Sequence, residues 1–409
     1  MTTPLLVVGS MRSGTTLLNR LLAAHPAVAM IYHPTRFFEW ATEAPLLDGP
    51  GALAKLSETY GYFGKLDETT RARSQEALRA LPAGAPKGEI YRALIGSLAG
   101  TPGAQVVGEK YAGRGAEMQP FHSLVPDGKI LMIVRDPRDV LLSNKKRMEQ
   151  EAEMENYWAG SHLMVLDDWA DLAVRHRSFD QVQGGTYLQI RYEDLVSEPE
   201  PSLRRVCAFI GVPFAPEMLQ EGALRHDDGR EWRANTSHGE AYAAVSDQSV
   251  GAYRAALSAG ELVCVNALLR EHMRMFGYAT DPPVAETDVL VDACNQFLSL
   301  GRIVTRHRIG DPRLYGRTRS ESENLFWFVE KVLAYAGLDP TLFLKGFATG
   351  RAVTVRSAEI AMQPVAAEVG TLRLSFESVS QELRNVRAAI DRFPSLLNVL
   401  KRFLRKPPA

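Results

Sequence analysis

Residues 9–16 read Gly-Ser-Met-Arg-Ser-Gly-Thr-Thr, and this octapeptide constrains the fold more than any other part of the chain. It follows an apolar run at residues 5–8 and precedes an apolar helical pattern at 16–24. A strand, a glycine-containing loop and a helix in this order predict an anion site, because loop N–H groups converge on the anion at the positive end of the helix. We call residues 9–16 the phosphate loop.

The two glycines of the phosphate loop have the Gly-x-x-x-x-Gly spacing of a P-loop, but Thr15 stands where a P-loop has its lysine. That lysine normally reaches the β- and γ-phosphates, so its replacement argues against a nucleoside triphosphate. The loop carries Arg12 instead, and a guanidinium is a permanent cation suited to a phosphate or a sulfonate. The loop therefore predicts a nucleotide whose 5′ group is short.

The composition of the 409-residue chain is that of a soluble globular protein, with 45% hydrophobic and 23% charged residues. Its net charge of -1 predicts no nucleic-acid partner. The three cysteines lie far apart, which favours buried free thiols in a reducing compartment over a metal or redox site. We expect no signal peptide, no membrane span and no metal, and hence a cytoplasmic protein.

Short apolar runs alternate with longer helical patterns along the chain. The expected strands are residues 5–8, 105–108, 129–134 and 186–190, and the expected helices are 16–24, 164–177, 201–210 and 259–275. This alternation predicts an α/β fold in three layers, with a parallel sheet between helices and a P-loop-like phosphate site at the carboxyl ends of the strands. Residues 44–104 are interpreted as a helical insertion or lid, and the Pro282-Pro283 pair as a domain boundary.

A second polar motif follows the apolar run at 129–134. There the sequence reads Arg135-Asp-Pro-Arg-Asp, with Ser143 eight residues after the first arginine. A strand that ends at Arg135 and a helix that begins near Asp139 would bring a cation and a hydroxyl together, as a second phosphate requires. The alternative is a structural ion pair of Arg135 with Asp136 or Asp139.

Together the two motifs resemble sulfotransferases that use 3′-phosphoadenosine 5′-phosphosulfate (PAPS), in particular bacterial members. The resemblance continues through Gly108-Glu-Lys110, Arg191-Tyr-Glu-Asp-Leu195, Trp232-Arg-Ala-Asn-Thr-Ser237 and residues 249–278. It implies a sulfotransferase domain at residues 1–280 and leaves a helical C-terminal region, 281–409, of unassigned role.

The resemblance also implies roles for individual residues. The 5′-phosphosulfate would be held by Arg12, Ser13, Gly14, Thr15 and Thr16. The 3′-phosphate would be bound by Arg135 and Ser143, while Tyr192 would wall the adenosine site or serve as a core aromatic. Arg233 or Asn235 would contact the nucleotide from a closing loop, or belong to an ordinary polar loop.

Catalysis in such an enzyme is an in-line displacement at sulfur, in which the protein positions the partners and neutralises charge on the leaving phosphate oxygen. Arg12 and Lys110 are the expected cations, although Lys110 alternatively pairs with Glu109 or faces solvent. For the general base, His33 and Glu39 are both candidates, because the segment after His25-Pro26 departs from the family pattern of a glutamate there.

The region beyond Pro283 lies outside the resemblance. Six arginines between Arg302 and Arg319 suggest either a groove for an anionic acceptor or a solvated helix face. Residues 359–392 have a helical composition, and a basic amphipathic pattern follows at 393–406. Residues 359–406 are therefore a candidate for peripheral contact with the inner membrane surface, for a homo-oligomer interface or for packing within the chain.

The sequence thus predicts a sulfotransferase that moves a sulfonate group from PAPS to a hydroxyl or amine acceptor. A carbohydrate or another small metabolite is the favoured acceptor class. The alternatives are a P-loop kinase, against which the missing lysine counts, and a non-catalytic adaptor that keeps the nucleotide fold and acts through its C-terminal helices.

Overall fold

A central parallel sheet organises the part of the chain that the structure describes. The computed structural model describes residues 2–31, 34–42, 47–59, 66–113, 115–152, 164–181, 185–220, 222, 224, 245–283, 289–290, 292–293, 331–337, 353–355 and 358–360. By contacts the chain divides into two compact units. The first unit comprises Met1–Asn156 and Asp168–Ala252, and it contains both sequence motifs.

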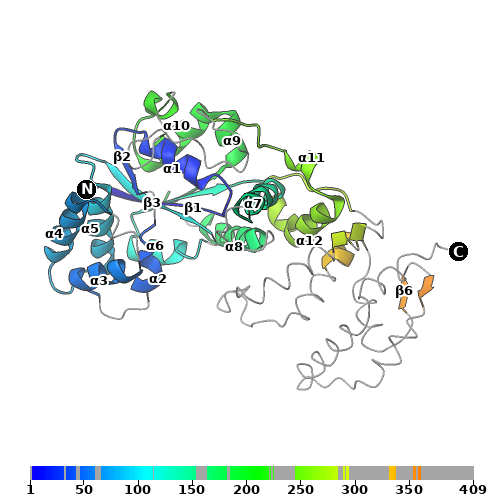
Figure 1. Ribbon diagram of the computed structural model, residues 1–409, viewed down its shortest axis with the longest axis horizontal. Coiled ribbons are helices and arrows are strands. Elements are labelled where there is room, and N and C mark those ends of the chain that lie inside the picture. The colour runs from blue at the N-terminus through cyan, green and yellow to red at the C-terminus, as the bar shows by residue number, and fades with distance from the viewer. Residues whose placement is uncertain are drawn as a thin grey trace, which may run out of the picture. The chain divides into compact units, whose positions relative to one another are not determined.

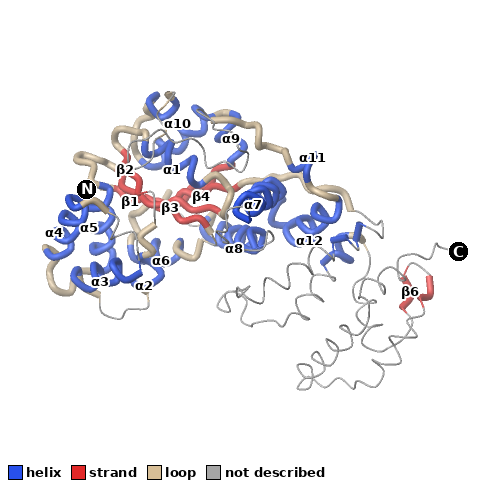
Figure 2. The backbone as a smooth tube through the Cα atoms, in the orientation of Figure 1, coloured by secondary structure: helices blue, strands red, loops and turns tan. Residues whose placement is uncertain are grey.

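The sheet of the first unit has five parallel strands in the order β2-β3-β1-β4-β5 (Figures 1 and 2). Its strands are β1 (Thr3–Gly9), β2 (Val28–Ile31), β3 (Val106–Ala112), β4 (Lys129–Val134) and β5 (Tyr187–Arg191). The middle strand β1 is buried from its second residue onward, which explains its unbroken apolar sequence. Because all five strands run the same way, their carboxyl ends share one edge, where the site residues gather.

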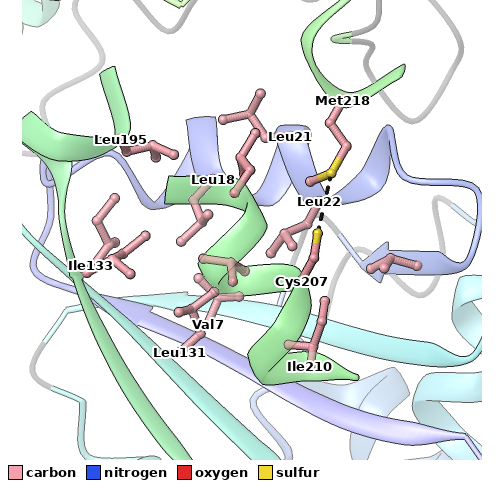
Figure 3. Close-up of a cluster of buried hydrophobic side chains, with 14 of the residues drawn as sticks. Val7, Leu18, Leu21, Leu22, Leu131, Ile133, Leu195, Cys207, Ile210 and Met218 are labelled. Atoms are coloured by element: carbon pink, nitrogen blue, oxygen red, sulfur yellow. Dashed lines mark hydrogen bonds between the residues drawn. The ribbon is translucent and has the colours of Figure 1, made fainter. Parts of the chain in front are cut away.

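One face of the sheet is covered by helices α1 (Thr15–Ala23), α9 (Tyr192–Ser197) and α10 (Pro199–Ile210), as Figure 1 shows. Leu18, Leu21 and Leu22 of α1 pack there against strand residues and against α10 (Figure 3). The thiol of Cys207 lies 3.8 Å from the sulfur of Met218 in this core, so the cysteine is a buried apolar residue, as its isolation in the sequence predicts.

The other face of the sheet is covered by five helices that lie, along the chain, between β2 and β4 (Figure 1). They are α2 (Phe37–Ala41), α3 (Gly49–Thr59), α4 (Glu68–Arg79), α5 (Lys87–Ala99) and α6 (Met118–Leu124). Phe37, Phe38, Tyr91 and Phe121 form edge-on and tilted ring contacts with centroids 4.7 to 6.0 Å apart. The three-layer α/β fold is confirmed. The described part of residues 44–104 is mainly helical, as predicted, and its role as a lid stays a prediction.

Helix α7 (Pro137–Ala152) follows β4, and helix α8 (Met164–Phe179) precedes β5. The predicted strands and helices of the first unit occur within a few residues of their expected bounds. Strand β2 was not expected, because four residues of ordinary apolar character give too short a pattern to separate from a loop. No helix among the described residues is long and apolar enough to cross a membrane.

The second unit, Tyr157–Asp167 and Tyr253–Ala409, contains four further elements. These are α11 (Tyr253–Ala256), α12 (Ala259–Met275) and the antiparallel strands β6 (Val353–Val355) and β7 (Ala358–Ile360). Ser258 and Glu261 form a capping box that starts α12. Glu359 lies in β7 rather than in a helix. It pairs with Thr354 of β6, and both Thr354 and the next residue, Ile360, are β-branched and favour extended backbone. The arginines at 302–319 and the amphipathic pattern at 393–406 lie outside the described residues.

The two units meet in sequence between Ala252 and Tyr253, earlier than the boundary expected at Pro282-Pro283. Helix α12, which the sequence assigns to the first domain, falls by contacts in the second unit. The end of the sulfotransferase domain at residue 280 stays a prediction.

Candidate active site

The phosphate loop turns sharply between β1 and α1. A side chain at Gly9 would meet the Ile133 carbonyl oxygen at 2.7 Å, so the loop can approach β4 only with glycine here. The Ser13 N–H donates to the Ser10 carbonyl over 3.2 Å, which closes the turn. Gly14 has a φ of 92°, a conformation that favours glycine.

Helix α1 begins at Thr15 without a side-chain cap and without an acidic residue in its first turn. The first N–H groups of a helix have no partner within the helix, and they carry the positive end of its dipole. An anion at the loop can therefore receive these N–H groups together with the hydroxyl of Thr16. The structure thus has the strand, loop and helix in the order that the spacing predicts, and the binding of an anion there stays a prediction.

Arg12 joins the two sequence motifs. Its side-chain Nε donates to Ser143 Oγ on α7 over 3.2 Å, and its carbonyl accepts a bond from Arg135 Nη1 over 3.2 Å. Arg12 has a φ of 67°, which costs a non-glycine residue about 1 kcal/mol and places both of these groups. The structure therefore brings Arg12, Arg135 and Ser143 together, as the sequence predicts.

Arg135 lies directly after β4, and only 6% of it is exposed. Its Nη2 donates to the Ser249 carbonyl over 2.8 Å, and its own carbonyl accepts from Trp169 Nε1 over 2.8 Å. Its Nε is buried without a hydrogen-bond partner among the described residues. A buried guanidinium with an unused donor fits a phosphate at this position.

The alternative ion pair of Arg135 with a neighbouring aspartate does not form. Asp136 instead binds Arg138 through two bonds of 2.9 and 2.6 Å, and this pair is buried. Asp139 accepts the Gly251 N–H over 2.7 Å. Asp136 is thus engaged within the motif and Asp139 with Gly251, and neither aspartate pairs with Arg135.

Tyr192 forms a wall beside the phosphate loop. Its ring is so close to Gly14 that a side chain there would lie 2.4 Å from Tyr192 Cδ2. The guanidinium of Arg135 lies 4.4 Å from the ring centroid. The Tyr192 hydroxyl lies 2.9 Å from Ser249 Oγ. The residue is 8% exposed, so it is at once a core aromatic and a contact of the two motifs.

Lys110 points toward the phosphate loop. Strand β3 lies beside β1, with Lys110 opposite Val7, and its Nζ lies 3.4 Å from Thr16 Oγ1. Glu109 points to the opposite face, as strand alternation requires, so the alternative Glu109–Lys110 pair does not form. Lys110 is therefore placed to reach the same anion as the loop.

Of the two candidate general bases, the structure describes Glu39 but not His33. Glu39 on α2 binds the guanidinium of Arg36, with two bonds from Arg36 Nε of 2.9 and 2.8 Å. The pair is exposed, and Glu39 is therefore engaged by a cation in the described structure. His33 lies outside the described residues, as do Arg233 and Asn235, and their assignments stay predictions.

The sequence reasoning missed two contacts at this edge of the sheet. One is the segment 249–251, which binds Arg135, Tyr192 and Asp139 through Ser249 and Gly251. The other is Thr35, which binds Glu109. Neither contact leaves a signal in a single sequence, because the partners lie 57 or more residues apart and are small or ordinary polar residues.

The fold and the site define an α/β protein in which a glycine loop leads from β1 into α1 and meets Arg135 and Ser143, which follow the neighbouring strand β4. The chain belongs to the sulfotransferase family, whose model matches residues 4–216, more than half of the chain.

Carbohydrate sulfotransferase 2 of mouse and of human is 34% identical to the chain over 94 residues. The match covers 23% of this chain and 17% of the relatives, so it spans only a small part of their length. Among solved structures, the sulfotransferase domain from the curacin biosynthetic pathway has a TM-score of 0.46 and 19% identity, covering 69% of this chain and 99% of that domain. Mouse sulfotransferase SULT7A1, solved with PAP, has a TM-score of 0.36 and 15% identity, covering 66% and 84%.

Proposed function

We propose that the chain transfers a sulfonate group from PAPS to a hydroxyl acceptor. The observation that carries this proposal is the meeting of Arg12, Ser143 and Arg135, with the buried Arg135 Nε left without a partner among the described residues. A P-loop lysine is absent, so the pair of cationic positions suits a nucleotide with separate 5′ and 3′ anionic groups. Membership in the sulfotransferase family supports the same reading.

In the proposed reaction an acceptor oxygen bonds to sulfur while the bond from sulfur to the 5′-phosphate oxygen breaks. The acceptor proton passes to a base, and 3′-phosphoadenosine 5′-phosphate (PAP) leaves. Arg12, Lys110 and the first N–H groups of α1 stabilise the charge that grows on the departing phosphate oxygen. Ser13, Thr15 and Thr16 orient the 5′ group, while Arg135 and Ser143 hold the 3′-phosphate.

A carbohydrate is the acceptor class we favour, and the match to carbohydrate sulfotransferase 2 supports it. We retain His33 and Glu39 as the two proposals for the base. A bacterial source, a cytoplasmic location and a membrane or oligomer contact through residues 359–406 also remain proposals, resting on the sequence patterns alone.

The first test is calorimetric titration with PAP, AMP and ATP. The wild type should bind PAP in preference to both other nucleotides, and Arg135→Ala should weaken PAP binding by about tenfold or more, since a charge-assisted contact is lost. Arg204→Ala is the matched control, because Arg204 pairs with Glu200 on the surface of α10, away from the loop. A preference for ATP, or equal losses in the two variants, would contradict the proposal.

A further inference from the structure

Glu109 is a fully buried carboxylate one residue from the proposed catalytic Lys110. Its exposed fraction is 0%, and its two oxygens accept bonds from the backbone N–H of Thr35 over 2.6 Å and from the Thr35 hydroxyl over 3.1 Å. Among the described residues no cation pairs with it. Burial of a charge without a counterion is unfavourable, so a purely structural contact would be better served by a neutral side chain.

The bonds to Glu109 fold the chain back after strand β2. Ile31, the last residue of β2, lies opposite Glu109 in the sheet register, and Thr35 returns four residues later to the same glutamate. The Thr35 hydroxyl also accepts the Phe37 N–H over 3.2 Å, which leads the chain into α2. Glu109 therefore determines the path of residues 34–37.

The next residue, Arg36, has a φ of 56°, an unfavourable conformation for a non-glycine residue. Such a conformation persists only where the surroundings impose it. The Thr35–Glu109 bonds hold the chain on one side of Arg36, and the ion pair with Glu39 holds it on the other. The segment is thus set in one strained geometry at the carboxyl edge of the sheet.

This edge also carries the phosphate loop and Lys110. In the strand order β2-β3-β1-β4-β5, Arg135 follows β4 on one side of the phosphate loop, while residues 34–36 follow β2 on the other. If the 3′-phosphate lies on the β4 side, the side next to β2 and β3 is left for the acceptor. We propose, resting on the proposed sulfonate transfer, that Glu109 is a positioning residue that holds the segment 34–36 in the geometry needed for acceptor binding.

The charge of Glu109 decides the strength of this contact. An ionised carboxylate accepts both Thr35 bonds, whereas a protonated one gives up part of its acceptor capacity. Burial raises the pKa of Glu109 to about 7, while the Thr35 bonds act to lower it. The other groups that face it are Tyr91 of α5 and Glu117 before α6, and the charge of Glu117 raises the pKa of Glu109 further. Tyr111 of β3 lies in the same surroundings.

Three variants test the contact directly by hydrogen–deuterium exchange of peptides covering residues 34–42, expressed as protection factors. The Thr35 bonds lower the pKa of Glu109 in the closed segment, relative to an open segment in which the carboxyl stays buried. In the wild type, protection should therefore rise from about pH 6 to about pH 8 as Glu109 ionises. Glu109→Gln should lower protection at the higher pH by about tenfold or more and remove the rise, because an amide offers one acceptor. Thr35→Val should lose protection in the same way as Glu109→Gln. Thr35→Ser, which retains the hydroxyl, should have the protection of the wild type. Unchanged protection in Glu109→Gln would overturn the proposal.

Measurements of nucleotide affinity and of acceptor kinetics distinguish this proposal from the proposed function. PAP affinity by calorimetry should stay within about twofold in Glu109→Gln, since Glu109 lies on the other face of β3 from the loop. With PAPS and a panel of methyl hexosides and N-acetylhexosaminides as acceptor probes, kcat/KM for the acceptor should fall and lose its rise between about pH 6 and about pH 8. Failure of the wild type to bind PAP would refute sulfonate transfer. The hydrogen–deuterium exchange experiment would still test whether Glu109 holds residues 34–36. A loosened segment with unchanged kcat/KM would show that Glu109 does not serve the acceptor.

Discussion

The guanidinium carbon of Arg135 lies 4.4 Å from the centre of the Tyr192 ring, and both side chains bind Ser249. The ring also lies against Gly14 of the phosphate loop. Tyr192 thus links the strand that carries the proposed 3′-phosphate residue to the loop that carries the 5′ group. Together with the bonds of Arg12 to Ser143 and Arg135, this aromatic side chain connects the two proposed anion positions.

Substitutions of Tyr192 should separate its ring from its hydroxyl. Tyr192→Phe keeps the ring beneath Arg135 and loses one bond to Ser249, so PAP affinity should fall by no more than about fivefold. Tyr192→Leu also removes the cation–π contact and the flat wall, and affinity should fall by about tenfold or more. Calorimetric titration with PAP measures both.

Tyr187→Phe provides the matched control for the hydroxyl, because Tyr187 lies on β5 and its hydroxyl contacts His176 of α8 and Met132 of β4. Its PAP affinity should equal that of the wild type. Equal losses in Tyr192→Phe and Tyr192→Leu would mean that the hydroxyl, rather than the ring, fixes Arg135.

Gly14→Ala should abolish nucleotide binding and destabilise the fold. The new methyl group would lie 2.4 Å from Tyr192 Cδ2, and the backbone φ of 92° is unfavourable for alanine. Gly84→Ala is the control, because Gly84 has a φ of 80° but no atom within 4 Å of the added carbon. Urea unfolding should show a loss of about 1 kcal/mol for Gly84→Ala and a clearly larger loss for Gly14→Ala. Similar losses would mean that the ring moves aside at little cost.

Lys110→Met should lower kcat for sulfonate transfer by about a hundredfold or more, while PAP affinity changes little. The reason is that Lys110 reaches the loop beside Thr16 and is expected to meet charge that develops mainly in the transition state. Turnover at saturating PAPS measures the effect. Lys129→Met is the control. Lys129 is the first residue of β4, and its Nζ donates to the Gly185 carbonyl. An unchanged kcat would remove Lys110 from the catalytic assignment.

The phosphate loop and the Arg135 motif could be predicted from sequence because each lies in one short segment beside a buried strand. Parallel strands then bring Arg12, Arg135 and Ser143 to one edge with no further information. Strand β2 and the Thr35–Glu109 contact could not be predicted in this way. A carboxylate next to a lysine in a strand is ordinary in sequence, and only the sheet register shows that Glu109 faces inward and Lys110 faces the loop.

The same limit applies to Ser249 and Gly251, small residues whose importance comes from where Arg135, Tyr192 and Asp139 lie. Their role depends on tertiary contacts. Ser249 binds Arg135, and Gly251 binds Asp139, each across more than a hundred residues of chain. Local pattern gives no access to such contacts, because neither hydrophobic period nor residue type distinguishes a serine that binds an arginine from a serine in a turn.

The buried carboxylate of Glu109 should make the free energy of unfolding depend on pH. Its pKa is about 7 in the folded chain against an ordinary value of 4.5, because burial disfavours the charged form. Below pH 4.5 both folded and unfolded chains hold the proton. Between 4.5 and about 7 only the unfolded chain releases it, so this group's contribution to the free energy of unfolding falls as pH rises. Above about 7 the contribution is constant.

The free energy of unfolding of the wild type, relative to Glu109→Gln, should therefore decline by up to about 3 kcal/mol across that range, as measured by urea unfolding. Thr35→Val keeps the carboxylate but removes a donor that lowers its pKa, so its decline should extend to higher pH. Parallel stability curves for the wild type and Glu109→Gln would show that Glu109 ionises in the fold as it does in the unfolded chain. In that case Glu109 would already be fully charged at pH 6, and the expected rise in protection between about pH 6 and about pH 8 would be absent.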